Sequence, residues 1–388
     1  MRKRRVAILG STGSIGRSTI DVVRRLGDRF EVHALAARVS SRRLTGQARR
    51  LRPARIVTTD RRACQRARKA LGREFSVEWG LEPLIDIARS PKVDILVMAM
   101  SGTMGLLPVV AALEKGKRVA IATKEILVAY GQRVMALAGR HGGEVLPVDS
   151  ELAAIHQCLR SGNSKEVKRV VLTASGGPFR DRKIPARATV RQVLDHPTWQ
   201  MGRKITVDSA TLMNKGLEAI ETSRLFGLDP HQVEAVVHPQ SIVHSFVEFA
   251  DGSVIAQLSD PDMRLPIQYA LCYPDRLPSP IRPLNLLKTG SLDFAPIDTK
   301  RFPCYDLARS ALRSGPQATC ALNAANERAV RAFLAGRIVF HDIPAIIRTT
   351  LKVQSSRGPK NPTIAKLMDI ESSALSTAEA LVNAAGGN

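Results

Sequence analysis

Two short segments of the chain combine carboxylates with hydroxyl, amide and ammonium groups. The first is Asp149-Ser150-Glu151, and the second is the run from Ser209 to Glu218, which contains Asn214 and Lys215. Three carboxylates can hold a hard divalent cation, and oxygen ligands favour Mg²⁺ or Mn²⁺ over zinc. A serine, an asparagine and a lysine can hold a phosphate beside that cation. The types of residue therefore predict one metal-and-phosphate site, with Asp149, Glu151 and Glu218 as metal ligands.

The spacing within each segment indicates which side chains share a face. Asp149 and Glu151 follow the apolar run Glu144–Val148, and on a strand or extended turn residues i and i+2 point the same way. On a predicted helix, Asn214 and Glu218 are spaced i, i+4, and Lys215 and Glu218 are spaced i, i+3. All three side chains therefore point to one side. A solvated or salt-bridged edge is the ordinary alternative for any single carboxylate pair. The joint recurrence of acids, lysine, asparagine and serine favours the site.

A glycine-rich segment, Gly10-Ser-Thr-Gly13-Ser-Ile-Gly16, lies between a predicted strand and a predicted helix. Glycines at such a turn let the backbone approach a pyrophosphate, which then sits at the helix N-terminus. The spacing is GxxGxxG rather than the commoner GxGxxG. A tight strand–helix turn without a ligand is the structural alternative.

The end of the second predicted strand indicates which dinucleotide is bound. An NAD site usually carries an acidic residue there, but the segment Leu35-Ala-Ala-Arg38-Val-Ser40 has none. An arginine and a serine suit a 2′-phosphate, so the sequence favours NADP. Arg38 could also be one more exposed arginine in an arginine-rich segment.

Two further segments have polar residues in predicted loops. Ser175-Gly-Gly-Pro-Phe-Arg180 could offer a hydroxyl and backbone N–H groups to a phosphate, or be an ordinary turn. His196-Pro-Thr-Trp199 suggests a lid that covers a ligand and excludes water, with Trp199 as its apolar plate. A surface histidine beside a hydrophobic anchor is the alternative. His238 and His244 start a predicted strand and are not assigned to the site.

The elements around these residues indicate an α/β protein with three parts. Short apolar strands alternate with helices in residues 1–148, which is typical of a doubly wound, Rossmann-like domain. Residues 149–275 suggest a central α+β catalytic domain, 276–303 a proline-rich linker, and 304–388 a C-terminal helical domain. The predicted strands are Val6–Leu9, Glu31–Leu35, Arg55–Thr58, Asp94–Met98, Arg118–Ala122, Glu144–Val148, Val167–Thr173, Val233–Val237, Ser241–Phe249 and Ser253–Leu258. The predicted helices include Ser18–Leu26, Leu107–Lys115, Thr211–Phe226, Asn323–Ala335 and Ile364–Ala384.

Composition limits the classes of function. The net charge is +23, and residues 1–75 hold 21 Lys or Arg against 5 Asp or Glu. A nucleic-acid surface is one reading of this charge, but aromatic residues are only 4% and no nucleic-acid-binding motif is present. We therefore expect an enzyme with anionic ligands and no nucleic-acid partner. A basic nucleic-acid-binding protein with a vestigial dinucleotide fold stays open, and a steep salt dependence of DNA affinity would reveal it.

Cysteine usage and hydropathy bear on the compartment. The five cysteines are widely spaced and form no CxxC pair, which favours reduced thiols. No stretch approaches the roughly 20 apolar residues of a membrane span. We expect a soluble cytoplasmic protein without a membrane partner.

Taken together, these motifs resemble those of the 1-deoxy-D-xylulose 5-phosphate reductoisomerase family over nearly the whole chain. The resemblance is carried by Gly10-Ser-Thr-Gly-Ser-Ile-Gly16, Pro147-Val-Asp-Ser-Glu151, Ser175-Gly-Gly-Pro-Phe-Arg180, Met201-Gly-Arg-Lys204, Val207-Asp-Ser-Ala-Thr211, Met213-Asn-Lys-Gly-Leu-Glu218 and His238-Pro-Gln-Ser241. It implies a homodimeric enzyme that uses NADPH and Mn²⁺ or Mg²⁺. Such an enzyme converts 1-deoxy-D-xylulose 5-phosphate to 2-C-methyl-D-erythritol 4-phosphate in non-mevalonate isoprenoid biosynthesis.

The resemblance also implies a role for each matching residue. The metal ligands would be Asp149, Glu151 and Glu218. The substrate would contact Lys124, Ser150, Glu151, Ser175, His196, Trp199, Ser209, Asn214, Lys215 and Glu218, of which Lys124, Glu151, His196 and Glu218 would be catalytic. The cofactor would contact Gly10, Thr12, Gly13, Ser14, Ile15, Arg38, Ser40, Thr123, Glu125 and Gly202.

Three departures from the family pattern concern mainly the cofactor. Arg38-Val39-Ser40 stands where the family usually has Gly-Lys-Asn, so a positive charge is kept but displaced by one position. Thr123-Lys124-Glu125-Ile126 replaces Asn-Lys-Glu-Ser, and Leu152-Ala153 replaces a more polar pair. None of these removes a predicted metal ligand. Another NADP-linked reductase on the same scaffold, acting on a different phosphorylated hydroxy-carbonyl compound, remains the enzymatic alternative.

Overall fold

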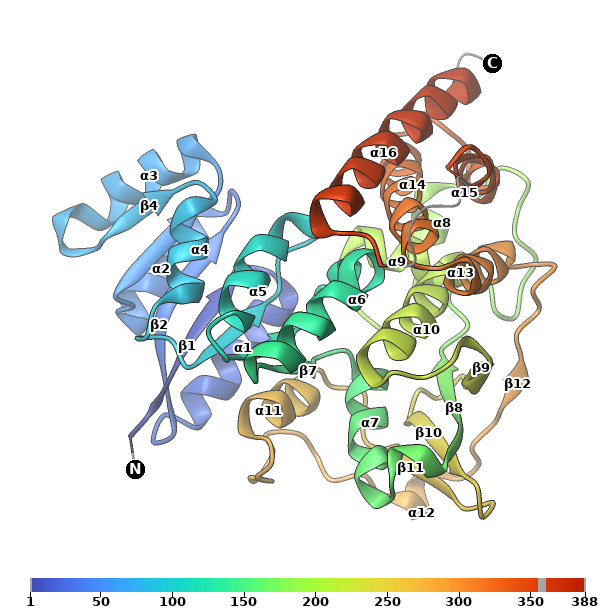
Figure 1. Ribbon diagram of the computed structural model, residues 1–388, viewed down its shortest axis with the longest axis horizontal. Helices are drawn as coiled ribbons and strands as arrows, with labels where there is room; N and C mark the ends of the chain where they lie inside the picture. Colours follow the sequence, from blue (N-terminus) through green and yellow to red (C-terminus); the bar gives the residue numbers. More distant parts are fainter. Residues whose placement is uncertain (1, 355–360, 387–388) are drawn as a thin grey trace. The chain divides into compact units, whose positions relative to one another are not determined.

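The computed structural model describes residues 2–354 and 361–386, and its chain forms two compact units (Figure 1). Unit 1 contains residues 1–126, 134–153 and 262–282, and unit 2 contains 127–133, 154–261 and 283–388. The chain therefore leaves unit 1 and returns to it, so neither unit is one continuous segment.

Unit 1 is built on a parallel seven-stranded sheet in the order β4-β3-β2-β1-β5-β6-β7. Its strands are short and mostly buried, as expected where helices cover a parallel sheet. The strands are β1 Arg4–Leu9, β2 Phe30–Ala37, β3 Arg55–Thr58, β4 Val77–Trp79, β5 Ile95–Met98, β6 Arg118–Ile121 and β7 Glu144–Pro147. The helices that follow them are α1 Ser14–Arg25, α2 Ser41–Leu51, α3 Arg61–Leu71, α4 Glu82–Arg89, α5 Leu106–Leu113, α6 Lys124–His141 and α7 Ser150–Cys158. This arrangement confirms the predicted doubly wound α/β fold.

The strand order reverses between β1 and β5, which lie side by side although β2 to β4 separate them in the chain. In open α/β sheets, ligands bind at the carboxyl ends of the strands beside such a reversal. The glycine segment follows β1, Thr123 follows β6 and Asp149 follows β7. The fold therefore places three of the predicted site segments along one edge of the sheet.

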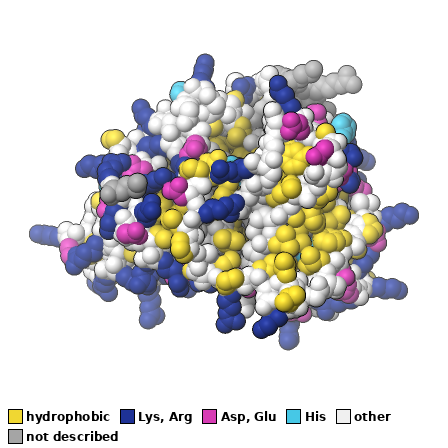
Figure 2. All heavy atoms as spheres, turned by 90° about the horizontal axis from the view of Figure 1, so that it is seen from below, with side chains coloured by type: hydrophobic (Ala, Val, Ile, Leu, Met, Phe, Trp, Pro, Cys, Tyr) yellow, Lys and Arg dark blue, Asp and Glu magenta, His cyan; other side chains and the backbone are white. Residues whose placement is uncertain are grey.

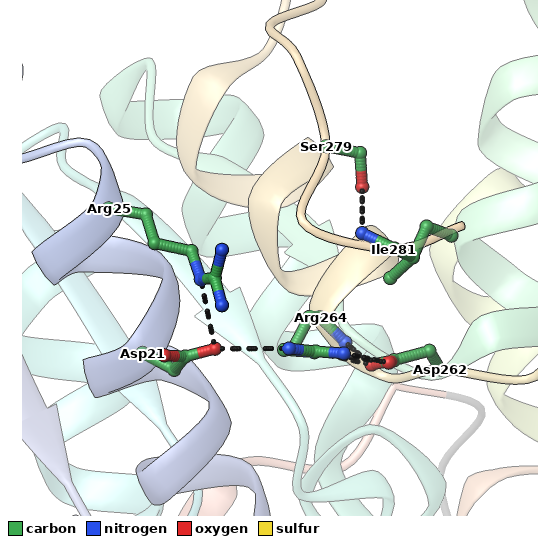
Figure 3. A network of polar contacts seen from close by, with 6 residues as sticks. All are labelled: Asp21, Arg25, Asp262, Arg264, Ser279 and Ile281. Atoms are coloured by element: carbon green, nitrogen blue, oxygen red, sulfur yellow. Dashed lines mark hydrogen bonds and ion pairs between the residues drawn. The ribbon is translucent and has the colours of Figure 1, made fainter. Parts of the chain in front are cut away.

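Helix α11, Arg264–Cys272, completes unit 1 from a distant part of the chain. It buries Ile267, Ala270 and Leu271 in the same core as β1 and β2. Arg264 forms ion pairs with Asp262 at 2.6 Å and with Asp21 of α1 at 3.3 Å (Figure 3). The Leu271 carbonyl oxygen accepts hydrogen bonds from the arginines at positions 4 and 118.

Unit 2 contains a five-stranded mixed sheet in the order β11-β10-β8-β9-β12. Its strands are β8 Val167–Ala174, β9 Val233–Val237, β10 Val243–Phe249, β11 Val254–Leu258 and β12 Ala295–Pro296. β10 and β11 form the antiparallel hairpin expected from Asp251-Gly252. Three α-helices lie between β8 and β9 in the chain, namely α8 Val190–Leu194, α9 Arg203–Ala210 and α10 Met213–Phe226.

The C-terminal part of unit 2 is helical, as predicted. It consists of α12 Leu286–Thr289, α13 Pro303–Ser314, α14 Pro316–Leu334, α15 Asp342–Val353 and α16 Ile364–Gly386. The contact between α14 and α16 uses alanines, among them Ala321, Ala324 and Ala374, whose small side chains permit close packing. Aromatic rings fill wider gaps, and Phe340 lies edge-on to Phe179 and Phe333.

Some local expectations differ from the structure. The predicted extended turn at Asp149–Glu151 is wrong, because Ser150 already begins α7. Helix α1 begins at Ser14 rather than Ser18, so Ser14 and Ile15 lie in its first turn. The sequence reading missed strand β4, which has only three residues, and the short elements α12 and β12 in the proline-rich segment.

All five cysteines are free and buried, as expected for reduced thiols, and burial raises the pKa of the Cys304 thiol to about 12. Among residues 2–354 and 361–386, no helix has the length and hydropathy needed to cross a bilayer.

Candidate active site

The glycine segment forms a tight turn between β1 and α1 in unit 1. Gly10 has φ +98°, and a Cβ there would lie 2.2 Å from the Ala99 carbonyl oxygen beyond β5. A Cβ on Gly16 would lie 2.3 Å from the Gly10 carbonyl oxygen. Gly13 is the N-cap of α1, so the helix N-terminus opens directly onto this turn. The backbone is thus packed as a phosphate-binding loop requires.

Helix α2 braces this loop through side chains that the sequence reading did not single out. Ser11 Oγ donates to Gln47 Oε1 at 2.8 Å, and Gln47 Nε2 donates to the Ser11 carbonyl oxygen at 2.8 Å. Arg43 of α2 donates to the Thr12 carbonyl oxygen at 3.1 Å, and Arg17 of α1 donates to the same oxygen at 3.2 Å. Two guanidinium groups therefore lie beside the predicted pyrophosphate position. In the sequence, the only sign of these two arginines is the high arginine content of this segment.

The remaining predicted cofactor residues of unit 1 lie after β2 and β6. Arg38 is exposed just beyond β2, and Ser40 is the N-cap of α2. Thr123 is buried, and its Oγ1 lies 2.6 Å from the Met100 carbonyl oxygen. Its hydroxyl therefore ties the end of β6 to the segment after β5. Glu125 is buried in the first turn of α6.

Lys124, Asp149, Ser150 and Glu151 form a compact polar group in unit 1. Lys124 Nζ lies 2.6 Å from Asp149 Oδ2, and Ser150 Oγ donates to Glu151 Oε2 at 2.6 Å. Burial raises the pKa of Asp149, Lys124 opposes that rise, and the Glu151 charge adds to it. Glu151 therefore acts electrostatically on Asp149 although it lies on a helix. A divalent cation would relieve the repulsion between the two carboxylates.

Asn214, Lys215 and Glu218 lie on one side of α10 in unit 2, as their spacing predicts. Glu218 is 1% exposed and Lys215 is 3% exposed. Asn214 Nδ2 donates to Glu218 Oε1 at 2.5 Å, and Lys215 forms an ion pair with Glu218 Oε2. A buried carboxylate needs such partners because desolvation penalises its charge. Asn214 and Lys215 occupy the first turn of α10, where the helix dipole favours an anion.

Ser175 and the predicted lid segment are in direct contact in unit 2. Ser175 Oγ lies 3.0 Å from His196 Nε2. His196 Nδ1 accepts hydrogen bonds from the backbone N–H groups of Thr198 at 3.1 Å and Trp199 at 2.9 Å. Because Nδ1 accepts both, the neutral ring carries its proton on Nε2, which donates to Ser175. Burial and the nearby Arg180 lower the pKa of His196, which favours this neutral form.

The Ser175 loop also abuts the end of α9, where Ser209 lies. Gly177 has φ +67°, and a Cβ there would lie 2.7 Å from the Ser209 carbonyl oxygen. Leu212, between α9 and α10, has φ +55°, an unusual conformation for a residue with a side chain. Gly202 is the N-cap of α9. Unit 2 therefore brings Ser175, His196 and Ser209 close to one another.

A buried network that the sequence reading missed supports α9. Asp208 is 1% exposed, and it pairs with Lys204 at 2.8 Å and accepts from Asn326 Nδ2 of α14 at 2.9 Å. These contacts anchor the helix that carries Ser209. Asn326 belongs to the segment Asn323-Ala-Ala-Asn-Glu327. The sequence spacing does not indicate that this segment contacts Asp208.

Each unit has its own group of buried and part-buried polar side chains. Unit 1 offers Asp149 and Glu151 next to Lys124, and unit 2 offers Glu218 next to a helix N-terminus. Within either unit, the described residues contain no group of three His, Cys, Asp or Glu side chains placed to hold a metal. The carboxylate and hydroxyl chemistry fits a hard cation such as Mg²⁺.

Three family models match successive parts of the chain. Residues 6–131 match 1-deoxy-D-xylulose 5-phosphate reductoisomerase. Residues 145–226 match the C-terminal domain model of that enzyme, and residues 258–377 match a further model, the DXP reductoisomerase C-terminal domain.

Relatives and solved structures agree with these models. The 1-deoxy-D-xylulose 5-phosphate reductoisomerase of Aromatoleum aromaticum is 49% identical over 361 residues, which cover 90% of this chain and 90% of the relative. The Endomicrobium trichonymphae enzyme is 44% identical over 98% of this chain and 99% of its own. A crystal structure of DOX-P reductoisomerase with NADPH, fosmidomycin and magnesium is 40% identical, has a TM-score of 0.92 and covers 98% of both chains. The Zymomonas mobilis enzyme with NADPH is 39% identical, with a TM-score of 0.90, and covers 98% of this chain and 99% of its own.

Proposed function

The chain belongs to the 1-deoxy-D-xylulose 5-phosphate reductoisomerase family, and from this we propose how its residues share the work of the reaction. It is an NADPH- and divalent-metal-dependent oxidoreductase that converts 1-deoxy-D-xylulose 5-phosphate to 2-C-methyl-D-erythritol 4-phosphate.

Ser175, Ser209, Asn214 and Lys215 bind the substrate phosphate in this proposal. The proposal rests chiefly on one observation, the buried trio Asn214, Lys215 and Glu218 at the start of α10. Lys215 supplies a charge and the first turn of α10 favours anions. A bound metal would neutralise part of the Glu218 charge that now pairs with Lys215. The Lys215 ammonium group would then be available to the phosphate.

Asp149, Glu151 and Glu218 are the proposed metal ligands, with Mg²⁺ or Mn²⁺ as the ion. When bound, the metal supplies Lewis acidity at the substrate oxygens, and NADPH supplies hydride. Lys124 and Ser150 would orient the reacting carbons, because Lys124 already lies against Asp149 and Ser150 against Glu151. This division makes Lys124 and Glu151 catalytic residues together with Glu218.

His196 is the proposed catalytic residue of the lid, and Trp199 is its apolar cover. The neutral ring donates a hydrogen bond from Nε2 to Ser175. When the substrate phosphate binds Ser175, the same N–H group would donate its hydrogen bond to a substrate oxygen instead. Two backbone N–H groups at Nδ1 hold the ring in this orientation. Closure over the ligand would exclude water from the reacting carbons.

NADPH binds unit 1 through the glycine loop and the ends of β2 and β6 in this proposal. Gly10, Thr12, Gly13, Ser14 and Ile15 line the pyrophosphate. The 2′-phosphate is read by Arg38 and Ser40, and the nicotinamide end is contacted by Thr123, Glu125 and, from unit 2, Gly202. The proposed functional division is 1–148 for NADPH, 149–275 for catalysis, 276–303 as a linker and 304–388 as the helical domain. Within this division, α11 packs into the core of the NADPH-binding part.

A homodimer is also proposed, with the outer face of the unit 2 sheet as the interface. Phe246 of β10 lies directly between Val171 of β8 and Ala256 of β11, and none of the three is buried. Phe294, 45% exposed, packs edge-on against Phe246. Figure 2 shows hydrophobic side chains gathered in one broad area on the side where β10 and β11 lie. A second copy would cover such a face by two-fold symmetry. Phe246→Lys should then give a monomer in light scattering.

The cytoplasm is the proposed compartment, because five buried free thiols suit a reducing environment. Fractionation of the source cells would test this, and recovery outside the cytoplasm would contradict it.

The decisive experiment follows NADPH oxidation with 1-deoxy-D-xylulose 5-phosphate, with and without Mg²⁺ or Mn²⁺. We expect oxidation that requires both the substrate and the metal. Absence of oxidation when both are present, or oxidation that persists without metal, would refute the assignment.

A variant pair tests the metal site at residue level. Glu218→Gln should abolish metal-dependent turnover while NADPH binding persists, because the amide loses the anionic ligand. Glu221→Gln is the matched control, since Glu221 is equally buried on the same helix but is not a proposed ligand. Full activity of Glu218→Gln would disprove the ligand role, and equal loss in both variants would point to folding instead.

A further inference from the structure

Unit 2 contains a cavity with a volume of about 500 Å³, which none of the proposed roles uses. Its walls come from four separate parts of the chain, at residues 183–184, at Thr211, at 300–304 before and in α13, and at 340–344 before and in α15. This volume lies within the range of roughly 300–1,000 Å³ typical of small-molecule sites.

The inner part of this cavity is apolar and its rim is cationic. Phe302, Cys304 and Phe340 line it, and all three are buried. Lys183 and Lys300 also line it, and both are exposed. No acidic residue lines this cavity in the described parts of the chain. The side chain chemistry therefore changes from apolar to cationic toward solvent.

The two lysines are available for an anion, whereas the neighbouring cations have other partners. Arg301 donates to the carbonyl oxygens of Arg180 at 3.3 Å and Arg182 at 2.6 Å, so it fixes the wall. His341 Nε2 lies 3.1 Å from the Pro185 carbonyl oxygen. In the described residues, neither lysine of the rim has an ion pair that would neutralise its ammonium group.

We propose that this cavity binds a small amphiphilic phosphate ester, with its apolar chain on Phe302 and Phe340 and its phosphate between Lys183 and Lys300. Two ammonium groups complement a phosphate dianion, and the apolar floor removes the chain from water. Neither an inorganic anion nor a neutral alcohol satisfies both surfaces. A site of this kind is separate from the proposed substrate residues, although it adjoins them.

The cavity adjoins the proposed phosphate site through Thr211. Thr211 lines the cavity and lies in the bend between α9 and α10. Its Oγ1 accepts from the Met213 backbone N–H at 3.3 Å and lies 3.1 Å from the Asp208 carbonyl oxygen. Ser209 and Asn214 flank this bend. A ligand in the cavity therefore contacts the segment that positions two proposed phosphate-binding residues, so its binding is coupled to substrate affinity.

Calorimetry with alkyl phosphates tests the site on the full-length protein. We expect hexyl phosphate to bind up to about fiftyfold more tightly than propyl phosphate, since its three additional CH₂ groups contribute about 2.4 kcal/mol when they are fully buried. Inorganic phosphate and hexanol should bind more weakly than either ester. Equal affinities for hexyl and propyl phosphate would overturn the apolar part of the proposal.

Variants locate the phosphate. The double change Lys183→Ala and Lys300→Ala should weaken hexyl phosphate at least about tenfold, because two charge-assisted contacts are lost. The matched control is Lys288→Ala, an exposed lysine of unit 2 outside the cavity. NADPH affinity and activity without hexyl phosphate should stay unchanged in both.

Two outcomes would overturn the site as placed. One is unchanged hexyl phosphate affinity in the double variant. The other is strictly competitive displacement by 1-deoxy-D-xylulose 5-phosphate, in which the loss of hexyl phosphate affinity grows without limit as the substrate concentration rises. Coupling between two separate sites would instead reach a plateau. The binding assay needs no turnover, so its failure is distinct from failure of the proposed enzymatic roles.

Discussion

The close approach of Gly177 to Ser209 gives a quantitative prediction about substrate binding. Gly177 and Gly227 both have φ +67°, but a Cβ on Gly177 would lie 2.7 Å from the Ser209 carbonyl oxygen, whereas a Cβ on Gly227 would meet nothing within 4 Å. Alanine in the left-handed region costs about 1–2 kcal/mol at either position. The two variants therefore share the backbone cost and differ in the clash.

The clash adds a second cost at Gly177 alone. Relieving an overpacked contact typically costs about 1–3 kcal/mol, so Gly177→Ala should destabilise unit 2 by roughly 2–5 kcal/mol in total. The relief must move either the Ser175 loop or the end of α9. If about 1.4 kcal/mol of that strain opposes phosphate binding, the KM for 1-deoxy-D-xylulose 5-phosphate rises about tenfold.

Steady-state kinetics and thermal melting of both variants test this reasoning. Gly177→Ala should show the raised substrate KM with NADPH affinity near the parent value, because the glycine loop of unit 1 is untouched. Gly227→Ala should lower the melting temperature modestly, by about 2–4 °C per kcal/mol, and leave the KM unchanged. Equal KM values in the two variants would refute the idea that the Gly177–Ser209 contact shapes the phosphate site.

Three further predictions concern other contacts. Arg38→Ala should raise the KM for NADPH and leave NADH use little changed, and an NADPH KM equal to the parent's would exclude Arg38 as a reader of the 2′-phosphate. The lowered pKa of His196 means that the neutral ring contributes fully above its unfolded pKa of 6.5, and that this contribution is lost as the pH falls through the folded value. Substrate KM should therefore rise in acid, and His196→Asn should lose that dependence; an identical pH profile would contradict the link to Ser175. Asp208→Ala should destabilise the protein by about 3–5 kcal/mol in denaturant titrations, because it leaves buried partners such as Asn326 unpaired, whereas a loss below 1 kcal/mol would count against this network.

Periodicity was a good guide to the fold where elements are long or fully buried. The boundaries of β3 and β9 agree with the predicted ones, and α10 keeps Asn214, Lys215 and Glu218 on one side. Strand β4 was missed because three residues carry too little pattern. The extended turn at Asp149–Glu151 was wrong because Ser150 can begin a helix as readily as it can occupy a turn.

The candidate site was only partly accessible from the sequence for a different reason. Motif residues stand out by type and spacing, whereas their supports are set by tertiary contacts over long sequence separations. Gln47 reaches Ser11 across 36 residues, and Asn326 reaches Asp208 across 118. Likewise, Ser175 and His196 were each noticed, but their mutual hydrogen bond depends on how the intervening loop folds. No local pattern specifies such partners.

The return of the chain to unit 1 at α11 has a consequence for biosynthesis. The hydrophobic core around β1 includes Ile267 and Leu271, and the Leu271 carbonyl oxygen binds Arg4 and Arg118. A ribosome must therefore synthesise most of the unit 2 sheet before it releases the residues that finish unit 1. Until residue 282 has emerged, the nascent dinucleotide-binding unit exposes the apolar surface of α1 that α11 later covers. A chain truncated at 261 would expose that surface permanently. A fragment designed to bind the dinucleotide therefore has to contain residues 262–282, either in their natural place in the chain or fused to the N-terminal part.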